Sequence, residues 1–222
     1  MFKRLSVAII IFSFVSNSFA QQIMSEKIIN TIENNSIEES VDILKSLSVN
    51  PAISKSEQLS ASIASAQLLE EKGDFLDACQ YYTNASALEG TNTVKGQNLL
   101  LDAVRCTLSV ADVSRGDFLL STAMSNPQSN EIRSRANLYA IWSWILKSQT
   151  KEELQGPISV LETYVTLYTM IEFRPTILLM LSYFTADSKW EKQLRSEFPM
   201  SSETLIVSGE NKLLPSPFWY LN

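Results

Sequence analysis

The sequence predicts an all-α fold, an α-solenoid of about ten helices paired into antiparallel hairpins. Glycine is scarce, with six residues among 222. No long alternation of apolar and polar residues indicates a strand, whereas cap signals recur just before apolar residues at helical spacing. The expected turns are short, so consecutive helices should run antiparallel. The pairs recur at about 40 residues, a period typical of helical repeat arrays.

Serines open the first three expected helices. Ser25 can cap the first helix. Ser36-x-x-Glu39 and Ser54-x-x-Glu57 match the capping box, in which the two side chains satisfy backbone N–H groups at a helix start. These helices are expected to end near Glu33, at Asn50-Pro51 and at Lys72.

Glycine and proline delimit the later helices. Gly73 should end the third helix in a left-handed conformation, and Gly116 should end the fifth. Gly156-Pro157 should start a helix, because proline is tolerated in a first helical turn. The later helices are expected at Asp74 to Leu88, Gln97 to Ser114, from Gly116 to Ser125, Glu131 to Lys147, from Gly156-Pro157, from Arg174-Pro175, and from Asp187 to Phe198-Pro199.

The N-terminus predicts a bacterial export signal. Lys3 and Arg4 precede the apolar run Leu5 to Val15, and Ser18-Phe19-Ala20 fits a small-x-small cleavage pattern. The run is too short to cross a ~30 Å hydrocarbon core, which needs roughly 20 residues. We therefore expect a signal peptide at residues 1–20 cleaved after Ala20, a periplasmic or secreted helical array at 21–203, and an extended aromatic tail at 204–222, with no membrane insertion after cleavage.

Composition argues against catalysis and against nucleic acid. The chain has no histidine, which removes the commonest general base and the commonest metal ligand. It has no glycine-rich phosphate loop and no cysteine cluster with metal-binding spacing. A net charge of −6 offers no basic stripe for phosphates. We expect no catalytic residue, no metal, no cofactor and no nucleic-acid partner.

The two cysteines allow two interpretations. Cys79 and Cys106 lie in neighbouring expected helices, about equally far from the turn at Thr91 to Thr93, so they reach a similar level in an antiparallel pair. An exported protein can form a disulfide between them. The alternative is that both are small buried apolar residues.

Small and large residues follow a regular pattern between Ser62 and Gly90. This stretch resembles a degenerate tetratricopeptide repeat, with Ser62 and Gly90 in place of the family's early tryptophan and closing proline. A second Gly-Asp-Phe at Gly116 to Phe118 matches the turn of a weaker unit. The pattern has small residues at Ala66, Ala78 and Ala85, larger ones at Leu69, Phe75, Tyr82 and Leu88, and Gly73 in the turn.

The resemblance implies a peptide-binding groove formed by the first helix of each repeat. Its residues here are Ile63, Gln67, Glu70 and Glu71. An acidic groove would select a basic or polar segment, although Glu70-Glu71-Lys72 also reads as a solvated helix end. Similar exported bacterial proteins imply a scaffold or adaptor in the cell envelope that binds another envelope protein or peptide.

Aromatic residues favour the alternative function, a peptidoglycan-binding or glycan-binding protein on a helical frame. A series at helical spacing either stacks on sugars or packs in a core. Trp144 lies off that face and is a candidate surface contact. In the tail, Phe218 and Trp219 either close a core, contact a partner or mediate self-association. The series is Tyr139, Trp142, Tyr164, Tyr168, Phe173, Tyr183 and Trp190.

Overall fold

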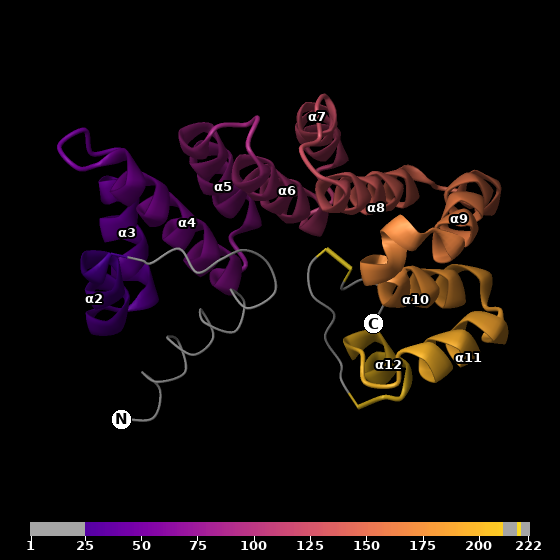
Figure 1. Ribbon diagram of the computed structural model, residues 1–222. Helices are drawn as coiled ribbons and strands as arrows, with labels where there is room; N and C mark the ends of the chain where they lie inside the picture. Colours follow the sequence, from indigo (N-terminus) through magenta and orange to yellow (C-terminus); the bar gives the residue numbers. More distant parts are fainter. Residues whose placement is uncertain (1–24, 211–216, 219–222) are drawn as a thin grey trace. The chain divides into compact units, whose positions relative to one another are not determined.

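The computed structural model describes residues 25–210, 217 and 218. Within these residues it contains eleven α-helices, one 3-10 helix and no strand, which confirms the all-α fold (Figure 1). The chain forms two compact units, Met1–Ala103 (unit 1) and Val104–Asn222 (unit 2), where the sequence predicted a single array over residues 21–203. The boundary falls inside helix α6 (Val94–Ser109).

The described part of unit 1 contains α2 (Glu26–Asn34), α3 (Ile37–Ser48), α4 (Lys55–Lys72) and α5 (Phe75–Glu89), followed by the start of α6. Both predicted capping boxes form. The Ser54 hydroxyl accepts a hydrogen bond from the Glu57 amide at 3.2 Å, and the Ser54 amide donates to the Glu57 carboxylate at 3.1 Å. Helix α4 packs against both α3 and α5, so serine, alanine and leucine are buried on most of its circumference.

Gly73 ends α4 as predicted. Its φ of +82° is left-handed, and its amide donates to the Glu70 carbonyl while the Asp74 amide donates to the Leu69 carbonyl. These bonds satisfy carbonyls at the helix end without a Cβ in the way. The α4–α5 hairpin then buries the predicted pattern residues Ala66, Leu69, Phe75, Ala78, Tyr82 and Ala85.

Seven further helical segments lie in the described part of unit 2. Its core lies along α10, whose residues 177–181 are all buried. Consecutive helices pack on one another, α7 on α8, α8 on α9, α9 on α10, and α10 on α11. The segments are α7 (Val113–Met124), α8 (Asn130–Lys147), α9 (Lys151–Thr166), the 3-10 helix η2 (Tyr168–Phe173), α10 (Arg174–Thr185), α11 (Ser188–Glu197) and α12 (Ser202–Val207).

The prediction that Gly116 ends a helix was wrong. Helix α6 ends at Ser109, Ala111 takes the left-handed conformation at φ +58°, and the Asp112 carboxylate caps α7 by accepting from the Arg115 amide. Gly116 lies inside α7 and is buried. A Cβ there would meet Leu108 Cδ2 at 3.0 Å, so this glycine permits a close approach rather than a turn.

The prediction that Gly156-Pro157 starts a helix was also wrong. Helix α9 begins at Lys151, where the Thr150 hydroxyl accepts from the Glu153 amide at 3.2 Å. The Glu153 carboxylate accepts from the Gln149 amide at 2.7 Å. This cap fixes the start earlier, and Pro157 lies inside the helix. A proline there lacks the N–H of a helical hydrogen bond, and its ring crowds the carbonyl four residues earlier. Helix α9 packs against α8 and α10.

The tail is not extended from residue 204, because α12 covers Ser202–Val207. The Ser201 hydroxyl accepts from the Thr204 amide, and the Thr204 hydroxyl donates to the Phe198 carbonyl at 2.7 Å. Packing on α10 and α11 outweighs the low helix propensity of the β-branched residues. The predicted signal peptide and Trp219 lie outside the described residues. Among the described helices, none is both long and apolar enough to cross a bilayer.

Candidate functional site

The four predicted groove residues lie on α4 in unit 1. Ile63, Gln67 and Glu70 are partly buried, and Glu71 is exposed. Successive residues of an α-helix turn by about 100°. Five residues therefore share an arc of about 80° along α4, which we call the α4 face: Ser56, Leu59, Ile63, Gln67 and Glu70.

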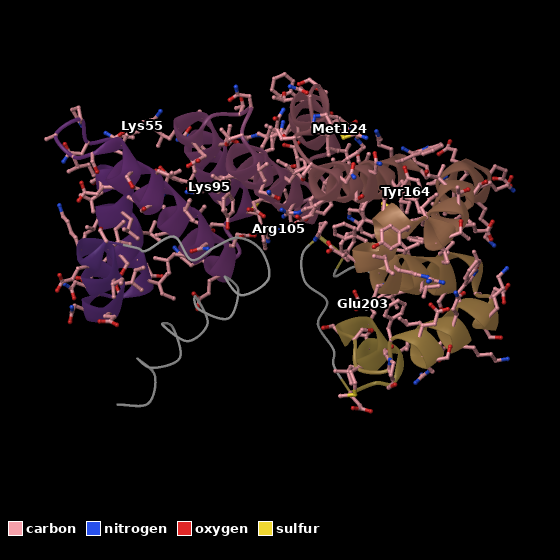
Figure 2. The ribbon with its side chains drawn as sticks, in the orientation of Figure 1. Lys55, Lys95, Arg105, Met124, Tyr164 and Glu203 are labelled. Carbon is pink, nitrogen blue, oxygen red and sulfur yellow. The ribbon has the colours of Figure 1, made fainter. Side chains whose placement is uncertain are left out.

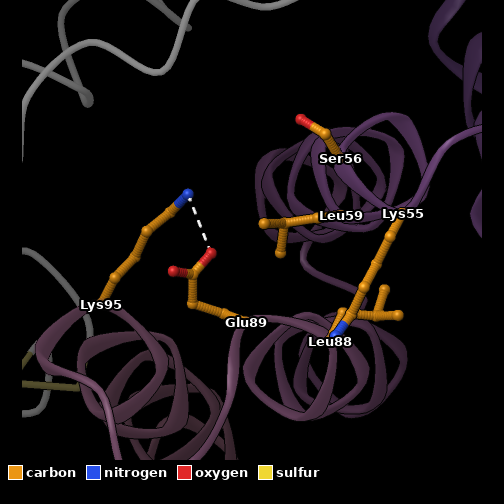
Figure 3. Close-up of a pocket in the computed structure, with 6 residues that line it drawn as sticks. All are labelled: Lys55, Ser56, Leu59, Leu88, Glu89 and Lys95. Atoms are coloured by element: carbon orange, nitrogen blue, oxygen red, sulfur yellow. Dashed lines mark ion pairs between the residues drawn. The ribbon is translucent and has the colours of Figure 1, made fainter.

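An open hollow of about 370 Å³ lies at the N-terminal end of the α4 face. Leu59 of α4 and Leu88 of α5 are its apolar residues. Figure 3 shows the Lys95–Glu89 ion pair, 3.2 Å long, on one side of Leu59 and Lys55 on the other. Lys55 lies at the first turn of α4, and Lys95 lies at the start of α6 (Figure 2). Sequence reasoning missed this hollow, because its residues come from three helices.

The other end of the α4 face is acidic. The Tyr82 hydroxyl of α5 donates to the Glu70 carboxylate at 2.7 Å, so Glu70 also links the two helices of the hairpin. Glu71 follows, and partial burial raises the pKa of its carboxyl above the ordinary value. The Gln67 side-chain oxygen is buried and has no hydrogen-bond partner among the described residues. Beside the α4 face, therefore, Lys55 and the Lys95–Glu89 ion pair lie at one end, and Glu71 lies next to Glu70 at the other.

The candidate surface contacts differ in their exposure. Trp144 is 44% exposed, while its indole lies against Gly156 of α9, where a Cβ would meet Cζ2 at 2.5 Å. Phe218 is only 7% exposed, which agrees with the alternative that it closes a core and not with a surface contact. Its ring is buried because it packs edge-on against Trp142 at a centroid distance of 5.3 Å. Cys79 and Cys106 are both fully buried, and their pairing stays a prediction.

The predicted aromatic series contains buried, partly buried and exposed rings. Tyr139 and Trp142 are buried in unit 2, as core packing requires. Tyr168 is 86% exposed and Tyr183 is 54% exposed, so these two rings are available to a ligand. Burial raises the pKa of Tyr164 above the ordinary value. The series is therefore not one continuous surface for sugar stacking.

A charged cluster that the sequence did not indicate links α7 to α8. The Asp117 carboxylate accepts from the buried Ser143 hydroxyl at 2.6 Å and from the Lys147 ammonium at 2.8 Å. Burial by itself raises the pKa of Asp117, but the hydrogen bonds from Lys147 and Ser143 and the lysine charge outweigh it, and the pKa is lowered. This arrangement is a structural bridge between α7 and α8, in which the serine hydroxyl donates a hydrogen bond to an ionised carboxylate.

No metal centre was found in the described part of the chain. A search of residues 25–210, 217 and 218 found no group of three or more cysteine, aspartate or glutamate residues that could hold an ion. The chain contains no histidine.

Comparison with known proteins gives two matches, each to part of the chain. The family model TP_0752_M, described as a middle domain, matches residues 146–222. A Treponema pallidum (strain Nichols) protein named "Uncharacterized protein" is 30% identical over 84 residues, which cover 38% of this chain and 22% of that protein. No solved structure matches. The family match falls within unit 2, so the α4 face lies outside it.

Proposed function

We propose that this chain is an exported, non-catalytic scaffold or adaptor that binds an extended segment of another bacterial envelope protein along the α4 face. The observation that carries the proposal is the continuity between the hollow and the predicted groove residues on one side of α4. The well-formed α4–α5 hairpin supports the resemblance to a tetratricopeptide repeat. The bacterial origin of the similar Treponema protein supports the bacterial setting.

The dimensions of the α4 face favour a short extended peptide. An α-helix rises about 1.5 Å per residue, so the face runs about 21 Å from Ser56 to Glu70. An extended chain advances about 3.3 Å per residue, and six or seven residues therefore span the face. A ligand of this length contacts both charged ends and the apolar residues between them.

The chemistry of the face defines the ligand. Leu59 and Leu88 favour an apolar side chain in the hollow, since burying apolar area is the main source of binding energy. Lys55 favours a carboxylate nearby, whereas the Lys95 ammonium is already paired with Glu89 at 3.2 Å. Glu71 favours a basic residue at the opposite end. The expected ligand is an extended segment with an acidic end, an apolar centre and a basic end.

Charge reversal at one end of the face tests the proposal. The chain is immobilised, proteins are captured from envelope extracts, and the same capture is repeated with Glu71→Lys. Glu71 is the better site than Glu70, because Glu70 also holds Tyr82. The matched control is Glu162→Lys, an exposed glutamate on α9 of unit 2.

The proposal expects a defined protein that is lost with Glu71→Lys and retained with Glu162→Lys. Equal capture by both variants would contradict it. Retention of the chain on insoluble peptidoglycan, without any captured protein, would favour the glycan-binding alternative instead. In that case substitution of the exposed Tyr168 by alanine should reduce retention.

Export is tested by the mass of the mature protein. The chain is expressed in a bacterium, recovered from the periplasm and weighed intact. We expect a mass that corresponds to Gln21 as the first residue, because cleavage should follow Ala20. A chain that keeps residues 1–20 and stays in the cytoplasm would contradict the periplasmic part of the proposal.

A further inference from the structure

Phe218 completes an aromatic cluster in unit 2. Its ring lies edge-on to Trp142 of α8 at 5.3 Å between centroids and 6.3 Å from the ring of Tyr139. On α10, the ring of Phe184 lies 6.4 Å from that of Trp142. Such tilted and edge-on contacts are the arrangements that aromatic pairs prefer. We call Tyr139, Trp142 and Phe184 the aromatic seat.

The seat is built from helices distant in sequence from Phe218. Its rings come from α8 and α10, whereas the helix that precedes Phe218 is α12, which ends at Val207. Phe218 is 7% exposed, and Pro217 beside it is buried as well. The contacts therefore join a Pro-Phe pair to a surface formed by other parts of the unit. A docked peptide contacts its receptor in the same way, through residues that are not its neighbours in sequence.

The Pro-Phe pair suits this seat in two ways. The phenylalanine ring packs edge-on against Trp142, which is 1% exposed. Proline in the ligand also restricts the chain before binding, which lowers the entropy lost on docking.

We propose that the aromatic seat is a binding site for a Pro-Phe peptide segment, and that the chain's own Pro217-Phe218 fills it. This site is separate from the α4 face, because all of its residues belong to unit 2. A ligand tethered to its receptor acts at an effective concentration that reaches millimolar for short linkers. The wild-type chain should therefore exclude the same peptide added from solution.

Peptide binding to the full-length chain tests the proposal. The receptor is Phe218→Ala, which empties the seat, and the wild-type chain is the matched blocked control. The probe is a fluorescently labelled peptide of residues 213–222, and its anisotropy is measured as receptor is added. A second peptide of the same sequence carries Phe218→Ala. Far-UV circular dichroism checks that both receptors have the same helix content.

The Phe218→Ala chain should bind the probe at least about tenfold more tightly than the wild-type chain does. The peptide without the phenylalanine should bind at least about tenfold more weakly than the probe. Equal binding of the probe by both receptors, or equal binding of both peptides, would overturn the proposal. If Phe218→Ala loses helix content, Phe218→Leu replaces it as receptor, because leucine keeps apolar bulk without the aromatic contacts. The same two comparisons then decide.

Size-exclusion chromatography separates the chain's own segment from that of a second copy. The wild-type chain should elute as a monomer at all concentrations. A concentration-dependent dimer that Phe218→Ala abolishes would overturn the assignment, since the occupant would then be a second copy.

Discussion

Gly96, the third residue of α6, lies against the backbone of the preceding turn. A Cβ built there would fall on the carbonyl oxygen of Gly90 and would lie 2.7 Å from its carbonyl carbon. The same turn is held by two hydrogen bonds, from the buried Ser86 hydroxyl to the Gly96 carbonyl at 2.6 Å and from the Gly96 amide to the Thr93 hydroxyl at 2.9 Å. Gly96→Ala therefore cannot be accommodated by a side-chain rotation.

The expected loss of stability combines three effects. Alanine in place of glycine favours a helix by at most about 1 kcal/mol. Overpacking typically costs about 1–3 kcal/mol, and the upper half applies here because the obstacle is backbone. A shift of the turn also breaks the buried Ser86 bond, and an unsatisfied buried group costs about 1–3 kcal/mol. We expect Gly96→Ala to lower the free energy of unfolding by about 3 kcal/mol.

Gly116→Ala is the matched control. Gly116 is the fourth residue of α7, and it gains the same helix propensity. A Cβ there meets only side chains, Leu108 Cδ2 at 3.0 Å and Thr107 Oγ1 at 3.1 Å. These can yield by a few tenths of an ångström. The cost should be about 1 kcal/mol and should offset the propensity gain, so we expect a change near zero.

Urea unfolding followed by far-UV circular dichroism measures both variants. Circular dichroism reports on helices throughout the chain, whereas all four tryptophans lie beyond residue 141, outside unit 1. Ser86→Ala isolates the hydrogen-bond component and should cost about 1 kcal/mol. A Gly96→Ala chain as stable as wild type, or as stable as Gly116→Ala, would refute the reasoning that the Gly90 backbone blocks a methyl group.

Substitutions at three further positions are checked by the same unfolding experiment. Asp117→Ala should lower the free energy of unfolding by about 1–3 kcal/mol, because it leaves the buried Ser143 hydroxyl without its acceptor. Asp117→Asn keeps an acceptor for that hydroxyl and should lower it by less. The pKa of Asp117 is lowered in the folded chain, so the stabilisation from its ionised form is present above its ordinary value of 3.8 and is lost as pH falls through the folded pKa. A difference in stability between wild type and Asp117→Asn that does not shrink as pH falls below 3.8 would contradict this. Ser54→Ala removes the α4 cap and should lower the free energy of unfolding by about 1 kcal/mol. An unchanged urea midpoint would contradict this prediction. Gly73→Ala places a Cβ in a left-handed conformation and should cost about 1–2 kcal/mol, and a gain in stability would argue against that conformation.

The helix starts that the sequence predicted best are those with a serine and a glutamate three residues apart. At Ser36 and Ser54 the partners are local, so the structure has the expected bonds whatever packs nearby. The predicted start of α9 was too late. Proline favours a first helical turn, which pointed to Pro157, but the Thr150 cap begins the helix at Lys151. The hollow beside Leu59 was missed because three helices must assemble before it exists.

The two Gly-Asp-Phe tripeptides separate what sequence determines from what tertiary structure decides. Sequence alone indicated a helical chain with Gly73 as a turn, since a glycine after a long helical stretch ends the helix through its own backbone. At Gly116 the same tripeptide is helical, because Ala111 already supplies the left-handed turn and Leu108 packs against the glycine. Phe75 is 9% exposed, whereas Phe118 is 69% exposed. The burial of each phenylalanine depends on the helix that packs beside it. A local sequence pattern does not show which face that helix covers.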